Sequence, residues 1–262
     1  MTSDRSNVDD FVTRHRLPTS FAKTVDEFYV PLARWLHRRM TASDPGTFVL
    51  GINGAQGTGK TTLSRFLSAY LRSNYELSVA ELSIDDIYLT RAERTALAHR
   101  VHPLLATRGV PGTHDVDLGH AIIDKLCALR DGESVALPRF DKSIDDRRSA
   151  SDWQDVTGPI DLIIFEGWCV GSTTQPAGEL ATPVNRLEAD EDTDCVWRSY
   201  VNEQLGTTYR PLFNKIAALV FLEAPGFDAI HRWRLEQERK LATSVGDDGT
   251  PLMDEAGLTR FI

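Results

Sequence analysis

Apolar residues in this chain follow two patterns that alternate along its length. Short, nearly continuous apolar runs are typical of strands buried on both faces of a sheet, and they cover residues 48–52, 78–84, 161–165 and 216–222, with a shorter run at 135–137. Between these runs, apolar residues recur at helical spacing, notably after residue 60 and over residues 118–129 and 197–205. Strands separated by helices predict an α/β domain with a mostly parallel sheet and helices on both faces.

Residues 1–46 precede the first expected strand and carry an amphipathic stripe of their own. Its apolar members recur mostly three or four positions apart from Phe21 to Leu36, which indicates a helix packed on the domain. Pro31 lies inside the stripe, so we expect the helix to be interrupted or kinked there. The chain is therefore expected to comprise a helical segment, 1–46, packed on the core, and a main domain, 47–262.

The stretch between the first expected strand and the following helix carries the strongest motif in the chain. It contains the phosphate-binding pattern G-x-x-x-x-G-K-[ST], the P-loop. Its glycines allow successive backbone N–H groups to point at one oxyanion, and the helix N-terminus adds partial positive charge. Lys60 can reach the β- and γ-phosphates, and the Thr61 hydroxyl can ligate Mg²⁺. We therefore expect a three-layer P-loop NTPase fold whose ATP site comprises Gly54, Ala55, Gln56, Gly57, Thr58, Gly59, Lys60, Thr61 and Thr62.

Carboxylates follow two other expected strands, at the strand ends where open α/β sheets place ligands. Asp85 and Asp86 come directly after residues 78–84, and Glu166 ends the apolar run 162–165. A carboxylate beside the phosphates can orient or deprotonate an attacking hydroxyl, or help to hold Mg²⁺. We expect Asp85 to act on the hydroxyl and Glu166 to hold Mg²⁺ in the Walker B role, with Asp85 as a further metal ligand. The alternatives are structural: an aspartate that caps the following helix, and a charged strand end.

Two loops contain residues suited to an anionic substrate. Residues 108–115 combine glycines and a proline with Arg108 and His114, a composition that favours a binding loop over a plain connection. Residues 138–148 contain Arg139, Lys142 and two further arginines. They can hold a carboxylate, since Arg binds that group through two parallel hydrogen bonds. The same charges equally suit a solvated surface loop, and their spacing alone does not decide between the two.

The C-terminal part of the chain adds an arginine-rich helical pattern over residues 231–240. In P-loop kinases a lid helix brings Arg to the transferring phosphoryl group. We expect Arg232 or Arg234 to do this, within a lid of about residues 226–250; the alternative is a basic solvated helix. The acidic run at 188–194 is interpreted as a solvated face. Another helix is expected from Asp254 to Ile262.

Composition narrows the function without identifying it. The 262 residues carry a net charge of −9, which argues against a nucleic-acid partner because such partners need a basic face. The three cysteines are widely spaced, so neither a disulfide framework nor a zinc site is expected. Residues 1–10 lack the apolar core of a secretory signal, and no apolar stretch approaches the roughly 18 residues of a membrane span. A cytoplasmic protein is expected, with its oligomeric state left open.

Several segments together resemble the D-glycerate 3-kinase family, which is related to uridine kinase, phosphoribulokinase and pantothenate kinase. The resemblance covers roughly residues 20–262. It rests on the P-loop and on S-I-D-D-I-Y-L-T at 83–90, R-G-V-P-G-T-H-D at 108–115, P-R-F-D-K-S at 138–143, F-E-G-W at 165–168, W-R-S-Y-V-N at 197–202 and W-R-L-E-Q-E at 233–238. Ile87 stands where the family has Phe, and the family's C-terminal helical segment is expected to be cut short at Ile262.

The resemblance implies a three-layer P-loop kinase that transfers a phosphoryl group from ATP, with Mg²⁺, to D-glycerate and yields 3-phosphoglycerate. It implies catalytic roles for Lys60, Asp85, Glu166, Arg232 and Arg234. The expected contacts of the hydroxy acid are Asp85, Asp86, Tyr88, Arg108, His114, Arg139 and Lys142. Two alternatives remain: a kinase of the same fold for a nucleoside, pantothenate-like acid or sugar, and an ATP-binding switch protein without a small-molecule substrate.

Overall fold

A computed structural model describes residue 8 and residues 10–244 of the chain, with side chains described up to residue 236. The expected helix at 254–262 and the end of the expected lid, residues 245–250, lie outside this range. Within it, the core of the molecule is a four-stranded sheet in the order β2-β7-β1-β8. All three strand pairs are parallel, as the apolar runs predicted. The strands are β1 (Phe48–Gly54), β2 (Val79–Ser83), β7 (Leu162–Gly167) and β8 (Ala218–Leu222).

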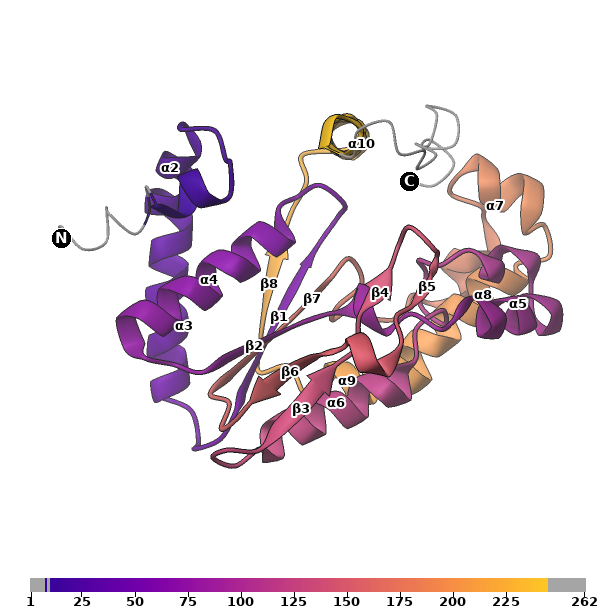
Figure 1. Cartoon of the computed structure of the whole chain (residues 1–262). Helices are drawn as coiled ribbons and strands as arrows, with labels where there is room; N and C mark the ends of the chain where they lie inside the picture. The colour runs from indigo at the N-terminus through magenta and orange to yellow at the C-terminus, as the bar shows by residue number, and fades with distance from the viewer. Residues whose placement is uncertain (1–7, 9, 245–262) are drawn as a thin grey trace.

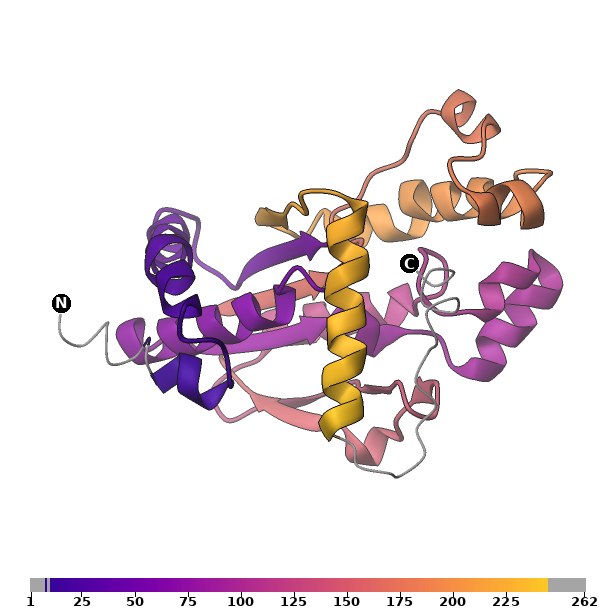
Figure 2. The same ribbon diagram turned by 90° about the horizontal axis from the view of Figure 1, so that it is seen from above.

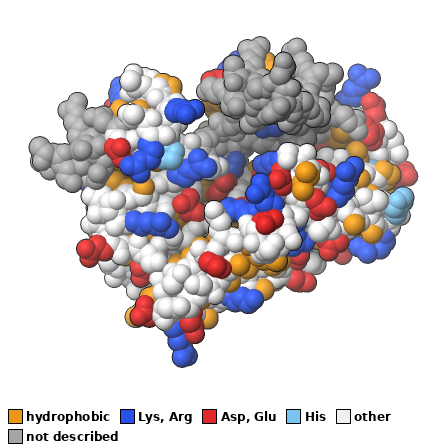
Figure 3. Space-filling model, viewed as in Figure 1, with side chains coloured by type: hydrophobic (Ala, Val, Ile, Leu, Met, Phe, Trp, Pro, Cys, Tyr) orange, Lys and Arg blue, Asp and Glu red, His pale blue; other side chains and the backbone are white. Residues whose placement is uncertain are grey.

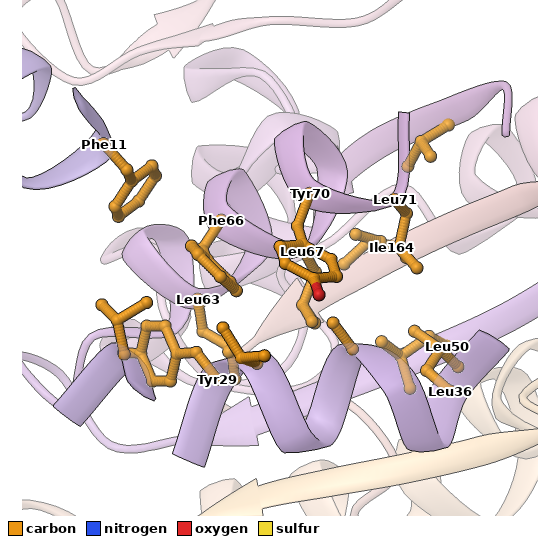
Figure 4. Close-up of a cluster of buried hydrophobic side chains, with 14 of the residues drawn as sticks. Phe11, Tyr29, Leu36, Leu50, Leu63, Phe66, Leu67, Tyr70, Leu71 and Ile164 are labelled. Carbon is orange, nitrogen blue, oxygen red and sulfur yellow. The ribbon is translucent and has the colours of Figure 1, made fainter. Parts of the chain in front are cut away.

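Helices cover both faces of this sheet, so the fold has the three layers expected of it (Figure 1). On one face, α3 (Val30–Thr41) and α4 (Lys60–Tyr75) pack on inward residues of β1 and β7. Figure 4 shows Phe66 of α4 near Phe11 and Tyr29, at one end of a cluster that also includes Leu36 and Leu50. On the other face, α6 (Val116–Ala128) and α9 (Arg210–Phe213) pack on the alternate residues of the same strands. Successive side chains of a strand point to opposite faces, and this is why strands buried on both faces read as continuous apolar runs.

The N-terminal stripe forms a helical run that passes through Pro31. The run comprises α2 (Phe21–Thr24), the π-helix η1 (Val25–Tyr29) and α3. Pro31 lies in the first turn of α3, where its missing N–H is tolerated. The helix was expected to be interrupted or kinked at Pro31, and the irregularity that the structure shows is the π-helix η1, just before that residue. Buried side chains of the run belong to the same hydrophobic cluster as β1 and α4.

Elements outside the central sheet form a helical and hairpin periphery. The helices are α5 (Arg91–Arg100), α7 (Arg186–Glu191), α8 (Val196–Gln204) and α10 (Phe227–Ser244). Two small antiparallel sheets pair β3 (Ser134–Leu137) with β6 (Gln154–Thr157) and β4 (Phe140–Asp141) with β5 (Asp146–Arg147). The short 3-10 helices are η2 (Ile84–Ile87), η3 (Pro103–Ala106), η4 (Ala150–Asp152) and η5 (Ala177–Ala181), and a second π-helix, η6 (Leu205–Tyr209), links α8 to α9. No helix in the described range is both long enough and apolar enough to cross a membrane.

The interpretation of residues 188–194 as a wholly solvated face is wrong for two of the acids. Glu188 and Asp192 are 8% and 2% exposed. Glu188 accepts a hydrogen bond from the Arg198 side chain at 3.3 Å, and Asp192 forms an ion pair with it at 3.4 Å. Asp192 also accepts from the backbone N–H groups of Trp197 and Arg198. A charge run does not reveal such burial, because the partner arginine lies on the next helix.

Candidate active site

The P-loop connects β1 to α4 and shapes a cradle for phosphate. Gly57 and Gly59 have φ angles of +80° and +92°, which favour glycine, and α4 begins at Lys60. Lys60 Nζ donates to the carbonyl oxygens of Gly54 and Ala55 at 2.8 Å and 3.0 Å, so the ammonium group lies within the loop. Burial lowers the pKa of Lys60, and the carboxylates of Glu166 and Asp85 act against that shift. A cation and an open helix N-terminus thus face the same small volume.

Glu166 reaches this cradle from β7, the strand beside β1. Its Cα is paired with Ile52 on one side and Ser83 on the other. The Thr61 hydroxyl donates to Glu166 Oε1 at 3.0 Å. Burial raises the pKa of Glu166, while the Lys60 ammonium opposes the rise. The structure therefore brings together two side-chain oxygens that lie 105 positions apart in the sequence, and oxygen is the donor atom that Mg²⁺ prefers.

Asp85 lies just beyond β2, in the short helix η2. Lys142 Nζ donates to Asp85 Oδ2 at 2.7 Å. Burial alone would raise the pKa of Asp85, but the charge and hydrogen bond of Lys142 outweigh it and hold the pKa below its ordinary value. Asp85 is therefore a carboxylate at neutral pH. The helix-cap alternative does not apply to it, because η2 is capped by Ser83 and α5 by Thr90.

Asp86 has a different environment from its neighbour. Its carboxylate accepts from Arg139 at 2.8 Å and from the backbone N–H of Phe140 at 3.2 Å. Burial raises its pKa, and the Arg139 guanidinium opposes this. Asp86 thus fastens the β4–β5 hairpin to the end of β2, and this contact places Lys142 beside Asp85.

The loop at 108–115 forms the adjoining wall. The His114 ring is 4% exposed and stacks on Tyr88, with ring centroids 4.3 Å apart. Arg108 pairs with Asp145 of the hairpin turn and lies 5.5 Å from the centre of the Phe140 ring. The structure therefore brings the expected substrate residues together, from the end of β2, the loop 108–115 and the hairpin.

Charges of the hairpin are largely matched within the protein, which neither sequence alternative anticipated. Arg147 pairs with Asp115 at 2.9 Å and Arg148 with Asp141 at 2.9 Å. Figure 3 shows blue and red side chains interspersed over this face of the molecule. The segment 138–148 is thus a folded hairpin whose charged side chains are held by ion pairs.

Sequence reasoning missed three residues that support the loop 108–115 and the hairpin: Arg94, Asp145 and Tyr209. Arg94 of α5 is fully buried and pairs with Asp145 at 3.0 Å, so that Asp145 lies between Arg94 and Arg108. Tyr209 bonds to His114 Nδ1 at 2.6 Å. Neither Arg94 nor Tyr209 stands in a motif. A signal for α5 did exist, since Thr90 and Glu93 form a capping box.

The expected lid helix crosses the P-loop. A Cβ atom built on Gly57 would lie 2.6 Å from Cβ of Trp233, so α10 rests directly on the loop. Figure 2 shows α10 passing over the N-terminal end of α4. Arg232 and Arg234 flank Trp233 on this helix; Arg232 is exposed and Arg234 is half-buried. The helix therefore packs on the phosphate loop, while its action as a lid and the roles of its arginines stay predictions.

This fold and site define a class of protein: a P-loop kinase, in which a parallel sheet carries a phosphate loop, neighbouring carboxylates and a covering helix. No family model matches the chain. The chain is 36% identical over 206 residues to an uncharacterised kinase of Schizosaccharomyces pombe, covering 76% of this chain and 72% of that protein. It is 30% identical over 251 residues, 90% of the chain, to the chloroplastic D-glycerate 3-kinase of Arabidopsis thaliana, of which it spans 51%.

The same relationship holds among solved structures. D-glycerate 3-kinase from Cryptococcus neoformans has a TM-score of 0.77 and 26% identity, with 90% of this chain and 84% of that one covered. The chain belongs to the family of P-loop small-molecule kinases that includes D-glycerate 3-kinase, and it is an ATP-dependent kinase.

Proposed function

We propose that this kinase transfers the γ-phosphoryl group of ATP to D-glycerate and forms 3-phosphoglycerate. The observation that carries the proposal is the Asp85 carboxylate, which lies just beyond β2, interacts with the charge of Lys60 and is paired with Lys142. Two relatives, from Arabidopsis thaliana and Cryptococcus neoformans, bear the name D-glycerate 3-kinase.

The phosphate side of the reaction uses the P-loop. The amides of residues 54–62 and the Lys60 ammonium hold the phosphates, and Arg232 or Arg234 of α10 offsets charge on the transferring group. Thr61 and Glu166, with Asp85, would hold Mg²⁺, which when bound neutralises phosphate charge. The residues fit this ion because their donors are oxygens, and the Thr61 hydroxyl and the Glu166 carboxylate lie within 3.0 Å of each other. Mg²⁺ usually keeps waters and phosphate oxygens as ligands.

Asp85 acts on the acceptor. Its low pKa keeps it ionised, so it can accept the proton of the attacking hydroxyl as that oxygen bonds to the γ-phosphorus and ADP leaves. Lys142 stabilises the carboxylate before transfer.

An anionic acceptor is favoured by the charges of the wall. The guanidinium groups of Arg94 and Arg108 share one carboxylate, Asp145, which leaves this cluster with one positive charge in excess. Arg108, His114, Arg139 and Lys142 are proposed to contact the carboxylate and hydroxyls of glycerate, with Asp86 and Tyr88 supporting them. A planar guanidinium suits a carboxylate, since the two can form paired hydrogen bonds.

The decisive experiment is ADP release from ATP and Mg²⁺ with D-glycerate, run beside L-glycerate, uridine and pantothenate. We expect a rate that depends on D-glycerate, and 3-phosphoglycerate as the product. A rate that depends on uridine or pantothenate instead would replace the proposed acceptor and leave the kinase assignment intact.

A further inference from the structure

Tyr209 connects the buried ring of His114 to the loop that carries it. Its phenol is fully buried at the end of η6. The backbone N–H of Gly112 donates to the phenolic oxygen at 2.8 Å, and His114 Nδ1 lies 2.6 Å from the same oxygen. The other ring nitrogen, Nε2, is shielded from solvent and has no hydrogen-bond partner among the described residues.

Hydrogen-bond counting determines which ring nitrogen carries the proton. Burial lowers the pKa of His114 to about 3, so the ring is neutral at neutral pH and has a single N–H. If that N–H were on Nδ1, the Tyr209 O–H and the Nε2 lone pair would both lack a partner. If the phenol donates to Nδ1 instead, only the Nε2–H is unmatched. The second arrangement leaves fewer buried polar groups without a hydrogen-bond partner and is therefore favoured.

The unmatched donor belongs to the acceptor side of the site. Residues 113–115 run antiparallel to residues 87–89, with Leu89 N–H bonded to Thr113 O at 2.9 Å and Asp115 N–H to Ile87 O at 2.7 Å. The His114 ring stacks on Tyr88, three residues from Asp85. Its charge state is influenced by the Asp85 carboxylate. An unmatched buried donor is costly, and an oxygen of the acceptor would satisfy it once binding uncovers this ring nitrogen, which the structure without acceptor encloses.

We propose that Tyr209 is a positioning residue, which holds His114 as a neutral Nε2–H donor to an oxygen of the acceptor. The inference rests on the proposed function, since it assigns the donor to a hydroxy-acid substrate. A neutral ring binds the acceptor oxygen and does not neutralise Asp85, so the carboxylate stays available for the hydroxyl proton. Tyr209 itself is fully buried, so we assign it no contact with the acceptor or the nucleotide.

The tautomer is tested directly by long-range ¹⁵N–¹H NMR correlation on the full chain labelled at histidine. The His114 signals are assigned by their loss in His114→Gln. We expect a protonated Nε2 and an unprotonated Nδ1 in the protein without acceptor. In Tyr209→Phe we expect a mixture of tautomers, and on addition of D-glycerate to the wild type we expect the Nε2–H signal to shift. A wild-type ring protonated at Nδ1 would overturn the inference.

Kinetics test the consequence. Loss of one fixed neutral hydrogen bond should raise the KM for D-glycerate roughly fivefold to tenfold in Tyr209→Phe, with the KM for ATP unchanged. Tyr200→Phe is the matched control, because Tyr200 packs on the same Gly112 and its hydroxyl makes no hydrogen bond within the part of the chain that the structure describes. That control should keep the wild-type KM. His114→Gln supplies an amide donor that has no tautomers. Adding Tyr209→Phe to this variant should therefore raise the KM for D-glycerate by a smaller factor than in the wild type.

The outcomes separate this inference from the proposed function. A wild type active on D-glycerate, with Tyr209→Phe unchanged in both KM and tautomer, overturns the inference alone. A wild type inactive on D-glycerate overturns the proposed acceptor, and the tautomer then still decides the role of Tyr209. If Tyr209→Phe does not fold, the wild-type tautomer and its response to D-glycerate decide.

Discussion

Lys142 Nζ lies 2.7 Å from Asp85 Oδ2, although the residues are 57 positions apart. The contact joins the β4–β5 hairpin to the end of β2 and sets the protonation state of the proposed base. We therefore expect the pH dependence of the reaction to depend on Lys142, a residue that transfers no proton itself.

Replacing Lys142 should move the acid limb of activity. In Lys142→Met the burial of Asp85 remains while the cation is lost, so the pKa of Asp85 rises. Because the base must be ionised, the fall of kcat/KM at low pH should begin at higher pH than in the wild type. The pH profile of kcat/KM measures this. Lys125→Met, which removes an exposed lysine of α6, should keep the wild-type profile; an unmoved profile in Lys142→Met would contradict the coupling.

Asp85→Asn should separate nucleotide binding from chemistry. Turnover should fall on the order of 10²–10⁴-fold, the usual contribution of a positioned general base, while the Kd for ATP measured without Mg²⁺ is kept. Calorimetric titration with ATP and the rate of ADP release measure the two quantities. Asp155→Asn, an exposed site on β6, is the control and should behave as wild type. Full turnover by Asp85→Asn would show that Asp85 is not the general base.

Gly57→Ala tests the contact between the P-loop and α10. A methyl group there would lie 2.6 Å from Trp233 Cβ, so the loop or the helix must move. We expect the Kd for ATP to rise roughly tenfold, equivalent to about 1.4 kcal/mol.

Gly132→Ala provides a control with the same backbone strain. Gly132 has φ +79°, against +80° for Gly57, but has no atom within 4 Å of the added methyl group. It should lose roughly 1–2 kcal/mol of stability through the left-handed backbone and keep its affinity for ATP. Equal ATP affinities in the two variants would show that the contact with α10 is unimportant.

Arg198→Met should destabilise the protein through α7 and α8. The substitution leaves the buried carboxylates of Glu188 and Asp192 without their cation. Arg186→Met is the control, because its partner Asp190 is on the same helix and both side chains are exposed. We expect the Tm of Arg198→Met to fall several times as far as that of Arg186→Met. Similar Tm values would contradict the structural role of the buried acids.

Much of the fold could be predicted because its signals are local. A strand buried on both faces needs apolar residues at every position, and a phosphate loop needs glycines at fixed positions before a helix. The strands of the central sheet were therefore predicted to within two residues of their observed bounds, whereas α10 was expected over 231–240 and spans Phe227–Ser244. The helix α5 was missed because its face is mostly polar, and the hairpin because each of its strands has two residues.

The sequence by itself determined the class of the protein, since the P-loop and the acids after successive strands can be read without knowing what they touch. Only the tertiary structure decided how those acids differ. Asp85 and Asp86 are adjacent and chemically identical, yet one is paired with Lys142 and the other with Arg139. Glu188 is buried in an ion pair with Arg198, which gives it a structural role. The Nε2 atom of His114 is buried without a hydrogen-bond partner among the described residues. Protonation state and role depend on which groups lie within a few ångströms, and folding brings those groups together from distant parts of the chain.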